Sequence, residues 1–138
     1  MGIKNKITDV EHVLCEGSFG SGKYYGYKKK KIVSLVKIST KCNIYGIGES
    51  LVGIYSPELF EINTKYLSKF LIGKDAKGGL NEINSLQKNK FFINSGLIKS
   101  ILSAIEMSLI DIVAKEEGLS ISNAIKKIYN INSSHHEV

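Results

Sequence analysis

One segment constrains this chain more than any other, an unbroken helical repeat of apolar residues between positions 95 and 118. The repeat has intervals of three and four, which place its side chains on one face of an α-helix. Its members are Leu97, Ile98, Ile101, Leu102, Ile105, Leu109, Ile112 and Val113. Asn94 or Ser95 is expected to cap the start of this helix, and Gly118 to end it. Other parts of the chain must cover so long an apolar face.

Three further helices are expected in the second half of the chain. Ser56, Pro57 and Glu58 have the pattern of a helix start, with a hydroxyl cap, an early proline and an acid at the positive end of the helix dipole. The apolar face expected for this helix consists of Leu59, Ile62, Tyr66, Leu67 and Phe70, before Gly73 ends it. Shorter helices are expected at residues 80–87 and 122–129, the last with Ser120 or Ser122 as its cap.

The first half has the pattern of β-strands. Residues 7–15 alternate imperfectly, and residues 32–40 are the strongest strand signal in the chain. Between them, residues 16–26 contain four glycines and predict a loop. A hairpin turn is expected at residues 41–43, with Asn43 at positive φ and a return strand after it. Strands followed by helices predict an α+β domain, a three-stranded antiparallel meander followed by three to four helices.

The composition agrees with one globular domain of 138 residues, 43% hydrophobic and 23% charged. This length excludes a large barrel, which needs roughly 200 residues or more. No apolar run approaches the roughly 18 residues of a membrane span, and the N-terminus lacks the apolar core of a secretory signal. We therefore expect a cytoplasmic location, with Cys15 and Cys42 as reduced thiols and Cys15 buried and inert.

The net charge of +6 raises the question of an anionic partner. All 19 basic residues are lysine, whereas guanine is most often read by arginine, so nucleic acid is not the expected partner. The cluster Lys28–Lys31 is interpreted as a solvated entry to a strand. The segment Gly17–Lys23 nearly matches the phosphate loop G-x-x-x-x-G-K-[ST], but Tyr24 replaces the hydroxyl residue and no helix is expected to follow. A small basic module that binds phosphate or nucleic acid through this loop is the alternative function.

No set of residues has the spacing of a catalytic or metal site. Glu106 and Asp111 are five residues apart on the predicted long helix, about 140° around its axis, so they do not share a face. His135 and His136 adjoin each other near the C-terminus with one more histidine, His12, elsewhere. Zinc sites usually need three or four converging ligands. We therefore assign no catalytic residue and no metal ligand.

Three segments carry a more specific pattern. Residues 40–49 read TKCNIYGIGE, residues 71–75 read LIGKD, and residues 103–118 read SAIEMSLIDIVAKEEG. In this order they resemble T-x-x-G-x-x-G-x-G-E, L-I-G-x-D and S-A-I-D-x-A-L-W-D-I-x-x-K-x-x-G of the mandelate racemase/muconate lactonizing branch of the enolase superfamily. The chain departs from that pattern at Asn43, Ser108 and Ile110, where the family commonly has glycine, alanine and tryptophan.

The resemblance implies that residues 1–125 form an N-terminal capping domain and that residues 126–138 are a helix end and a disordered tail. In this family a base removes the proton next to a substrate carboxylate and magnesium stabilises the enediolate, both from a (β/α) barrel. No barrel is present in these 138 residues. We therefore expect an isolated or truncated capping domain that binds no magnesium and has no activity alone. Its expected partner is a separately encoded barrel or a second copy, with a small carboxylate substrate only when a barrel is present.

The resemblance also places two substrate-gating loops, at residues 16–26 and 50–56. Such loops close over the barrel mouth, exclude water and select the substrate. The first is rich in glycine and the second is apolar. The predicted gating residues are Ser18, Phe19, Tyr24, Leu51, Val52 and Tyr55, with hairpin or core packing as the alternative role of each.

Overall fold

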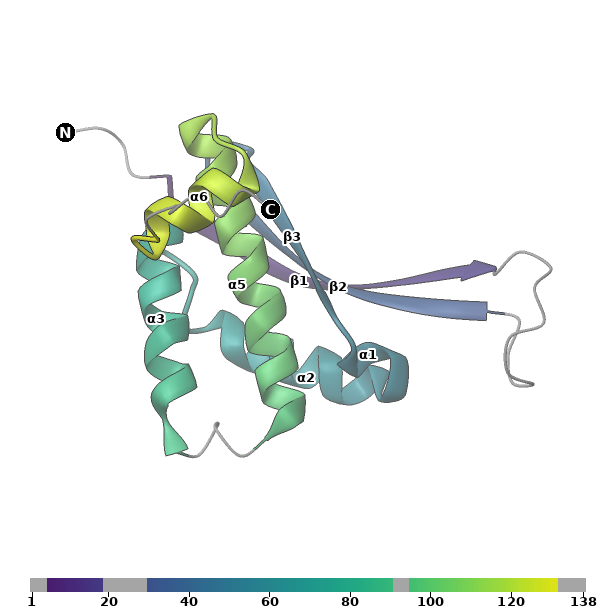
Figure 1. Cartoon of the computed structure of the whole chain (residues 1–138). Coiled ribbons are helices and arrows are strands. Elements are labelled where there is room, and N and C mark those ends of the chain that lie inside the picture. The colour runs from purple at the N-terminus through teal and green to yellow at the C-terminus, as the bar shows by residue number, and fades with distance from the viewer. Residues whose placement is uncertain (1–4, 19–29, 91–94, 132–138) are drawn as a thin grey trace, which may run out of the picture.

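The computed structural model describes residues 5–18, 30–90 and 95–131, with three strands followed by helices (Figure 1). The strands form one antiparallel sheet in the order β1-β2-β3. They are β1 (Ile7–Ser18), β2 (Lys30–Thr40) and β3 (Tyr45–Ser50). The helices are α1 (Val52–Tyr55), α2 (Pro57–Ser68), α3 (Ala76–Lys88), α5 (Gly96–Glu117) and α6 (Ile121–Ile128). The predicted α+β meander is confirmed, with the short α1 as an addition.

The long helix α5 is the centre of the core, as its apolar repeat predicts. Ser95 caps it by accepting a 3.3 Å hydrogen bond from the amide of Ile98, and Gly118 ends it at a φ of 63°. Figure 1 shows α5 across the sheet with α3 beside it. Of the predicted repeat, six members are buried and the two nearest the start, Leu97 and Ile98, are partly buried against the core.

The turn between β2 and β3 is also as predicted. Asn43 has a φ of 59°, and its amide donates to the carbonyl of Thr40 at 3.1 Å. The Thr40 hydroxyl donates to the carbonyl of Ile44 at 2.7 Å. The turn is therefore held by both backbone and side chain.

Residues 71–75 join α2 and α3 to the start of the sheet. Gly73, at a φ of 82°, donates its amide to the Ile7 carbonyl at 2.9 Å, and the Ile7 amide donates to Lys74 at 2.8 Å. The Asp75 side chain then accepts from the amide of Gly78 at 2.7 Å. This cap explains why α3 begins at Ala76, ahead of the predicted start at residue 80.

The first predicted loop begins later than expected. Glu16 and Gly17 belong to β1, opposite Ile32 and Lys31, because β2 is long enough to continue the ladder. Cys15, expected to be buried, is exposed, because the end of the β1–β2 hairpin extends beyond the helices (Figure 1). The remainder of the predicted loop, residues 19–26, lies outside the described residues.

The face that α2 turns to the core differs from the prediction. The buried residues of α2 are Phe60, Thr64 and Leu67, and the helix ends at Ser68. Leu59, Ile62 and Tyr66, which were expected in the core, are exposed. The reason is that α2 has two neighbouring apolar faces, and the core takes the one that carries the large Phe60 ring.

The last described helix, α6, begins soon after the end of α5. Ser120 caps α6 through a 3.2 Å hydrogen bond from the amide of Asn123, which decides between the two predicted caps. The end of α6 is helical as expected, and residues 132–138 of the predicted tail lie outside the described residues. None of the described helices has the length and apolar character needed to cross a bilayer.

Candidate functional site

The segment between β3 and α1 is fixed by a set of serine hydroxyls. Ser50 is buried, and its hydroxyl lies 3.1 Å from that of Ser100 on α5. The Ser34 hydroxyl of β2 donates to the Ser50 carbonyl. The amide of Leu51 donates to the Ser100 hydroxyl at 3.3 Å, and the amide of Val52 to the Ser50 hydroxyl at 3.2 Å. The backbone of this segment is therefore tied to both β2 and α5.

This anchored segment holds two large apolar side chains out to solvent. Leu51 is 60% exposed and Tyr55 is 85% exposed. Val52, between them, is buried instead and packs in the core. Exposed side chains on a fixed backbone add little to the stability of the domain itself and are available for contact.

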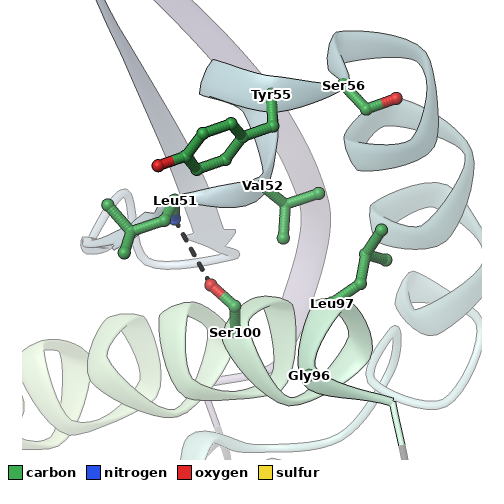
Figure 2. A pocket seen from close by; sticks show the side chains of 7 residues that line it. All are labelled: Leu51, Val52, Tyr55, Ser56, Gly96, Leu97 and Ser100. Carbon is green, nitrogen blue, oxygen red and sulfur yellow. Dashed lines mark hydrogen bonds between the residues drawn. The ribbon is translucent and has the colours of Figure 1, made fainter.

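A cavity of about 300 Å³ lies beneath these side chains. Its lining consists of Leu51, Val52, Tyr55, Ser56, Gly96, Leu97 and Ser100. Figure 2 shows Tyr55 above the cavity, with Val52 pointing from α1 toward α5 and Leu97 pointing back. Among these described lining residues none carries a charge, so the cavity suits a neutral apolar group rather than a carboxylate.

Several described titratable groups outside this cavity have structural partners. Tyr129 donates its hydroxyl to one oxygen of Glu106, and the side-chain amide of Gln87 donates to the other at 3.3 Å. Burial, together with this hydrogen bond and the charge of Glu106, raises the pKa of Tyr129 to about 12. Hydrogen bonds from Lys127 and Lys77 lower the pKa of Glu117. Residues of α3, α5 and α6 are tied together in this way.

No metal centre is present among the described residues. No group of three or more histidine, cysteine or acidic side chains converges within residues 5–18, 30–90 and 95–131. Glu106 and Asp111, predicted not to share a face, have separate partners, Tyr129 and Lys115 respectively. The described part of the chain therefore offers no donor set of the kind that the magnesium implied by the family resemblance would need.

Comparison with known proteins decides the family. Residues 25–125 match the profile of the mandelate racemase/muconate lactonizing enzyme N-terminal domain. The chain belongs to this family. It is also 31% identical, over 96 residues, to a D-galactonate dehydratase family member from Paenibacillus sp. (strain JDR-2). That alignment covers 68% of this chain and 23% of the relative.

Solved structures show the same fold. An enolase superfamily member from Agrobacterium tumefaciens superposes with a TM-score of 0.75 at 22% identity, covering 89% of this chain and 38% of that one. A muconate cycloisomerase from Azorhizobium caulinodans superposes with a TM-score of 0.66 at 21% identity, covering 88% and 30% respectively. This N-terminal domain thus spans less than half the length of each of these proteins.

The fold of this N-terminal domain brings together three of the six predicted gating residues, Leu51, Val52 and Tyr55. Ser18 ends β1, and its side chain is not described. Phe19 and Tyr24 lie outside the described residues. The described geometry of the candidate site is that of the second predicted loop.

Sequence reasoning missed the part of the cavity that comes from the first turn of α5. Leu97 and Ser100 line the cavity and lie more than forty positions after Leu51 in the sequence. The apolar repeat predicted that Leu97 is on the inner face of its helix, but it did not show which segment that turn would meet. A hydrophobic period of two or 3.6 residues shows which side chains share one face of a strand or helix. It does not show which distant segments of the chain come into contact.

Only the first two residues of the glycine-rich alternative site, Gly17 and Ser18, are among the described residues, and both belong to β1. Gly17, the first glycine of the motif, pairs with Lys31 inside the β1–β2 ladder. The next described element is the strand β2 and not a helix. A phosphate loop delivers the anion to a helix N-terminus, so the described residues do not favour this function.

Proposed function

We propose that this chain acts as the capping domain of an enolase-superfamily enzyme and selects substrate at the mouth of a (β/α) barrel, with no turnover of its own. The observation that supports this most is the anchored display of Leu51 and Tyr55. Ser50 and Ser100 hold the backbone, while the two apolar side chains project from it. A segment that selects substrate is most precise when its contact side chains stand on a fixed backbone.

In this proposal the barrel and the cap have different roles, and the role of the cap follows from the chemistry of its described side chains. The barrel supplies the base that removes the proton next to a substrate carboxylate, and it holds the magnesium. Leu51, Tyr55 and Leu97 contact the end of the substrate that is remote from the carboxylate and exclude water from it. The other predicted gating residues are proposed to contact the substrate as well. They are Ser18, Phe19 and Tyr24.

The uncharged lining of the cavity gives this proposal a substrate preference. A carboxylate or phosphate placed against Leu51, Val52 and Leu97 would lose its hydration without gaining a counter-charge. We therefore propose that the cap favours substrates whose remote end is neutral and apolar. Acids with a hydroxyl at every carbon are expected to be poorer substrates than acids with an aryl or alkyl end.

The first test is turnover by the chain alone. Purified chain is incubated with magnesium and with acid sugars, mandelate-like acids and dipeptides, and racemisation and dehydration are followed by chiral chromatography and mass spectrometry. No product is expected. Magnesium-dependent product from this chain alone would contradict the proposal.

The second test joins the chain to the barrel portion of the Paenibacillus relative in place of that protein's own N-terminal domain. In this fusion, Tyr55→Ala and Leu51→Ala should raise KM for acids with an apolar end by about tenfold each, the scale of losing one apolar contact. Met107→Ala, at an exposed apolar position elsewhere on α5, is the matched control. An active fusion in which all three variants behave alike would refute a gating role for this segment.

A further inference from the structure

The helix α2 carries a second apolar face that the domain leaves open. Leu59, Ile62 and Tyr66 are 44%, 63% and 47% exposed. Their intervals of three and four place them in one row along the helix, which we name the outer stripe. The core-facing residues Phe60, Thr64 and Leu67 lie on the adjacent face. A helix that is apolar on two faces normally has a contact on each.

The charged residues beside the outer stripe are ordered along it. Glu58 lies in the first turn of α2, and Lys65 and Lys69 lie at its end, all three exposed. At 100° per residue these three side chains fall on the same flank of the outer stripe, within about 90° of it. One flank is therefore acidic at the N-terminal end and basic at the C-terminal end.

We propose that the outer stripe binds a second copy of this chain, with the two α2 helices antiparallel about a twofold axis near Ile62. In an antiparallel pair the same flanks of the two helices meet, end to opposite end. Glu58 then faces Lys65 and Lys69 of the second copy. In a parallel pair opposite flanks of the two helices meet, so Glu58 would face neither lysine of the second copy and the charge order would add nothing to the contact.

The same axis pairs the apolar residues of the outer stripe. Leu59 faces Tyr66 of the second copy, and Ile62 lies next to its own counterpart. Each end of the interface thus combines one aliphatic and one aromatic side chain, and the centre is aliphatic. Charge order and apolar order give the same axis, which is what a self-complementary surface requires.

This contact goes beyond the proposed capping function and uses different residues. None of Glu58, Leu59, Ile62, Tyr66 and Lys69 lines the cavity beneath Leu51 and Tyr55. A single pair of 12-residue helices buries less area than a standard interface. The dimer is therefore weak and forms in the upper micromolar range.

Sedimentation velocity of the full chain from about 10 µM to about 1 mM tests the contact. The weight-average sedimentation coefficient should rise toward that of a dimer. Ile62→Lys places two like charges at the axis and should leave a monomer throughout. Ile121→Lys, at a position of similar exposure on α6, is the matched control and should dimerise as the native chain does. A native chain that stays monomeric, or an Ile62→Lys variant that still dimerises, overturns the proposal.

Charge exchange tests the antiparallel arrangement and does not depend on the apolar centre. Glu58→Lys alone, and Lys65→Glu with Lys69→Glu, should each weaken self-association at least tenfold. A third variant that carries all three changes in one chain should dimerise again, because in the twofold antiparallel pair every facing pair is then of opposite sign. Circular dichroism confirms that the three variants are folded. A triple variant that associates no better than the other two would overturn the twofold antiparallel contact.

Discussion

Gly48 of β3 lies directly against Ala104 of α5: a Cβ added to this glycine would stand 1.9 Å from the Ala104 carbonyl oxygen. Gly46 lies two residues earlier on the same face of β3, and a Cβ added to it would stand 1.9 Å from the carbonyl oxygen of Ser108. The two backbones therefore touch where other residues would hold them apart. This close approach sets the position of α5 on the sheet and so brings Ser100 to Leu51.

The first prediction concerns that contact. Gly48→Ala introduces a Cβ that clashes with the backbone of α5. Because a backbone cannot move aside as the tip of a flexible side chain can, β3 and α5 are forced apart. We expect the free energy of unfolding to fall by about 2–3 kcal/mol, the cost of overpacking a core. Urea denaturation followed by circular dichroism measures this loss.

Gly17→Ala is the control for the same change of residue type. No atom lies within 4 Å of a Cβ at Gly17, which is in a strand. Gly17→Ala should change the free energy of unfolding by no more than about 0.5 kcal/mol. Equal losses at the two positions would show that the cost belongs to glycine replacement in strands and not to the contact with α5.

The second prediction concerns the outer edge of β3, where two α5 side chains bind the backbone. Asp111 accepts the amide of Ile47 at 3.2 Å, and Lys115 donates to the carbonyl of Tyr45 at 2.6 Å and to Asp111 at 2.7 Å. Asp111→Ala should lower the free energy of unfolding by about 1–2 kcal/mol, because it removes two hydrogen bonds at a partly exposed site.

The Asp111–Lys115 pair itself should contribute less. Both side chains reach solvent, so a double-mutant cycle with Lys115→Ala should give a coupling energy of about 0.5 kcal/mol. Light scattering of the double variant should also rise with time, since the bare strand edge can pair with another chain. A coupling energy of zero would show that each side chain binds the backbone independently.

The third prediction is a pH dependence that arises from Tyr129. Burial and Glu106 raise its pKa to about 12 in the folded chain, above the ordinary value of 10. The folded state therefore favours the neutral phenol. The stabilisation is complete below pH 10 and decreases as the pH rises toward about 12, because the unfolded chain ionises first. Denaturant midpoints measured from pH 9 to pH 12 should fall over this range.

Tyr129→Phe tests the assignment of that pH dependence. The variant loses the hydrogen bond to Glu106, so its midpoint at pH 8 should be lower than that of the native chain. Its further decrease above pH 10 should be smaller, because one ionising phenol is removed. A decrease as steep as in the native chain would assign the alkaline transition to other tyrosines or to lysines.

Much of this fold follows from local sequence patterns, because its decisive features are local. The apolar repeat and glycine end of α5, the proline start of α2 and the turn at Asn43 depend on residues within a few positions of one another. The core face of α2 does not follow in this way. Two apolar faces compete there, and the choice depends on where the Phe60 ring fits against β1.

The candidate site, like the fold, follows only in part from local sequence patterns. The apolar character of Leu51 and Tyr55 is visible in the sequence, and so is their place after the return strand. The buried state of Val52 and the approach of Leu97 and Ser100 depend on how α5 crosses the sheet. That crossing is set by the glycines of β3, whose role appears only when both backbones are placed.

The last prediction tests the anchor of the candidate site. Ser100 accepts the amide of Leu51 at 3.3 Å and lies 3.1 Å from the Ser50 hydroxyl. Ser100→Ala removes both contacts and leaves the buried Ser50 hydroxyl with fewer partners, so the free energy of unfolding should fall by about 1 kcal/mol. Amide hydrogen exchange at Leu51 and Val52 should accelerate about tenfold or more, while exchange in α3 follows the global loss alone. Ser103→Ala, at an exposed position on α5, is the matched control and should change neither. If amide exchange at Leu51 instead follows only the global stability, the segment is held by the packing of Val52 and not by Ser100. The positions of the Leu51 and Tyr55 side chains would then depend on the core and not on the Ser100 hydroxyl.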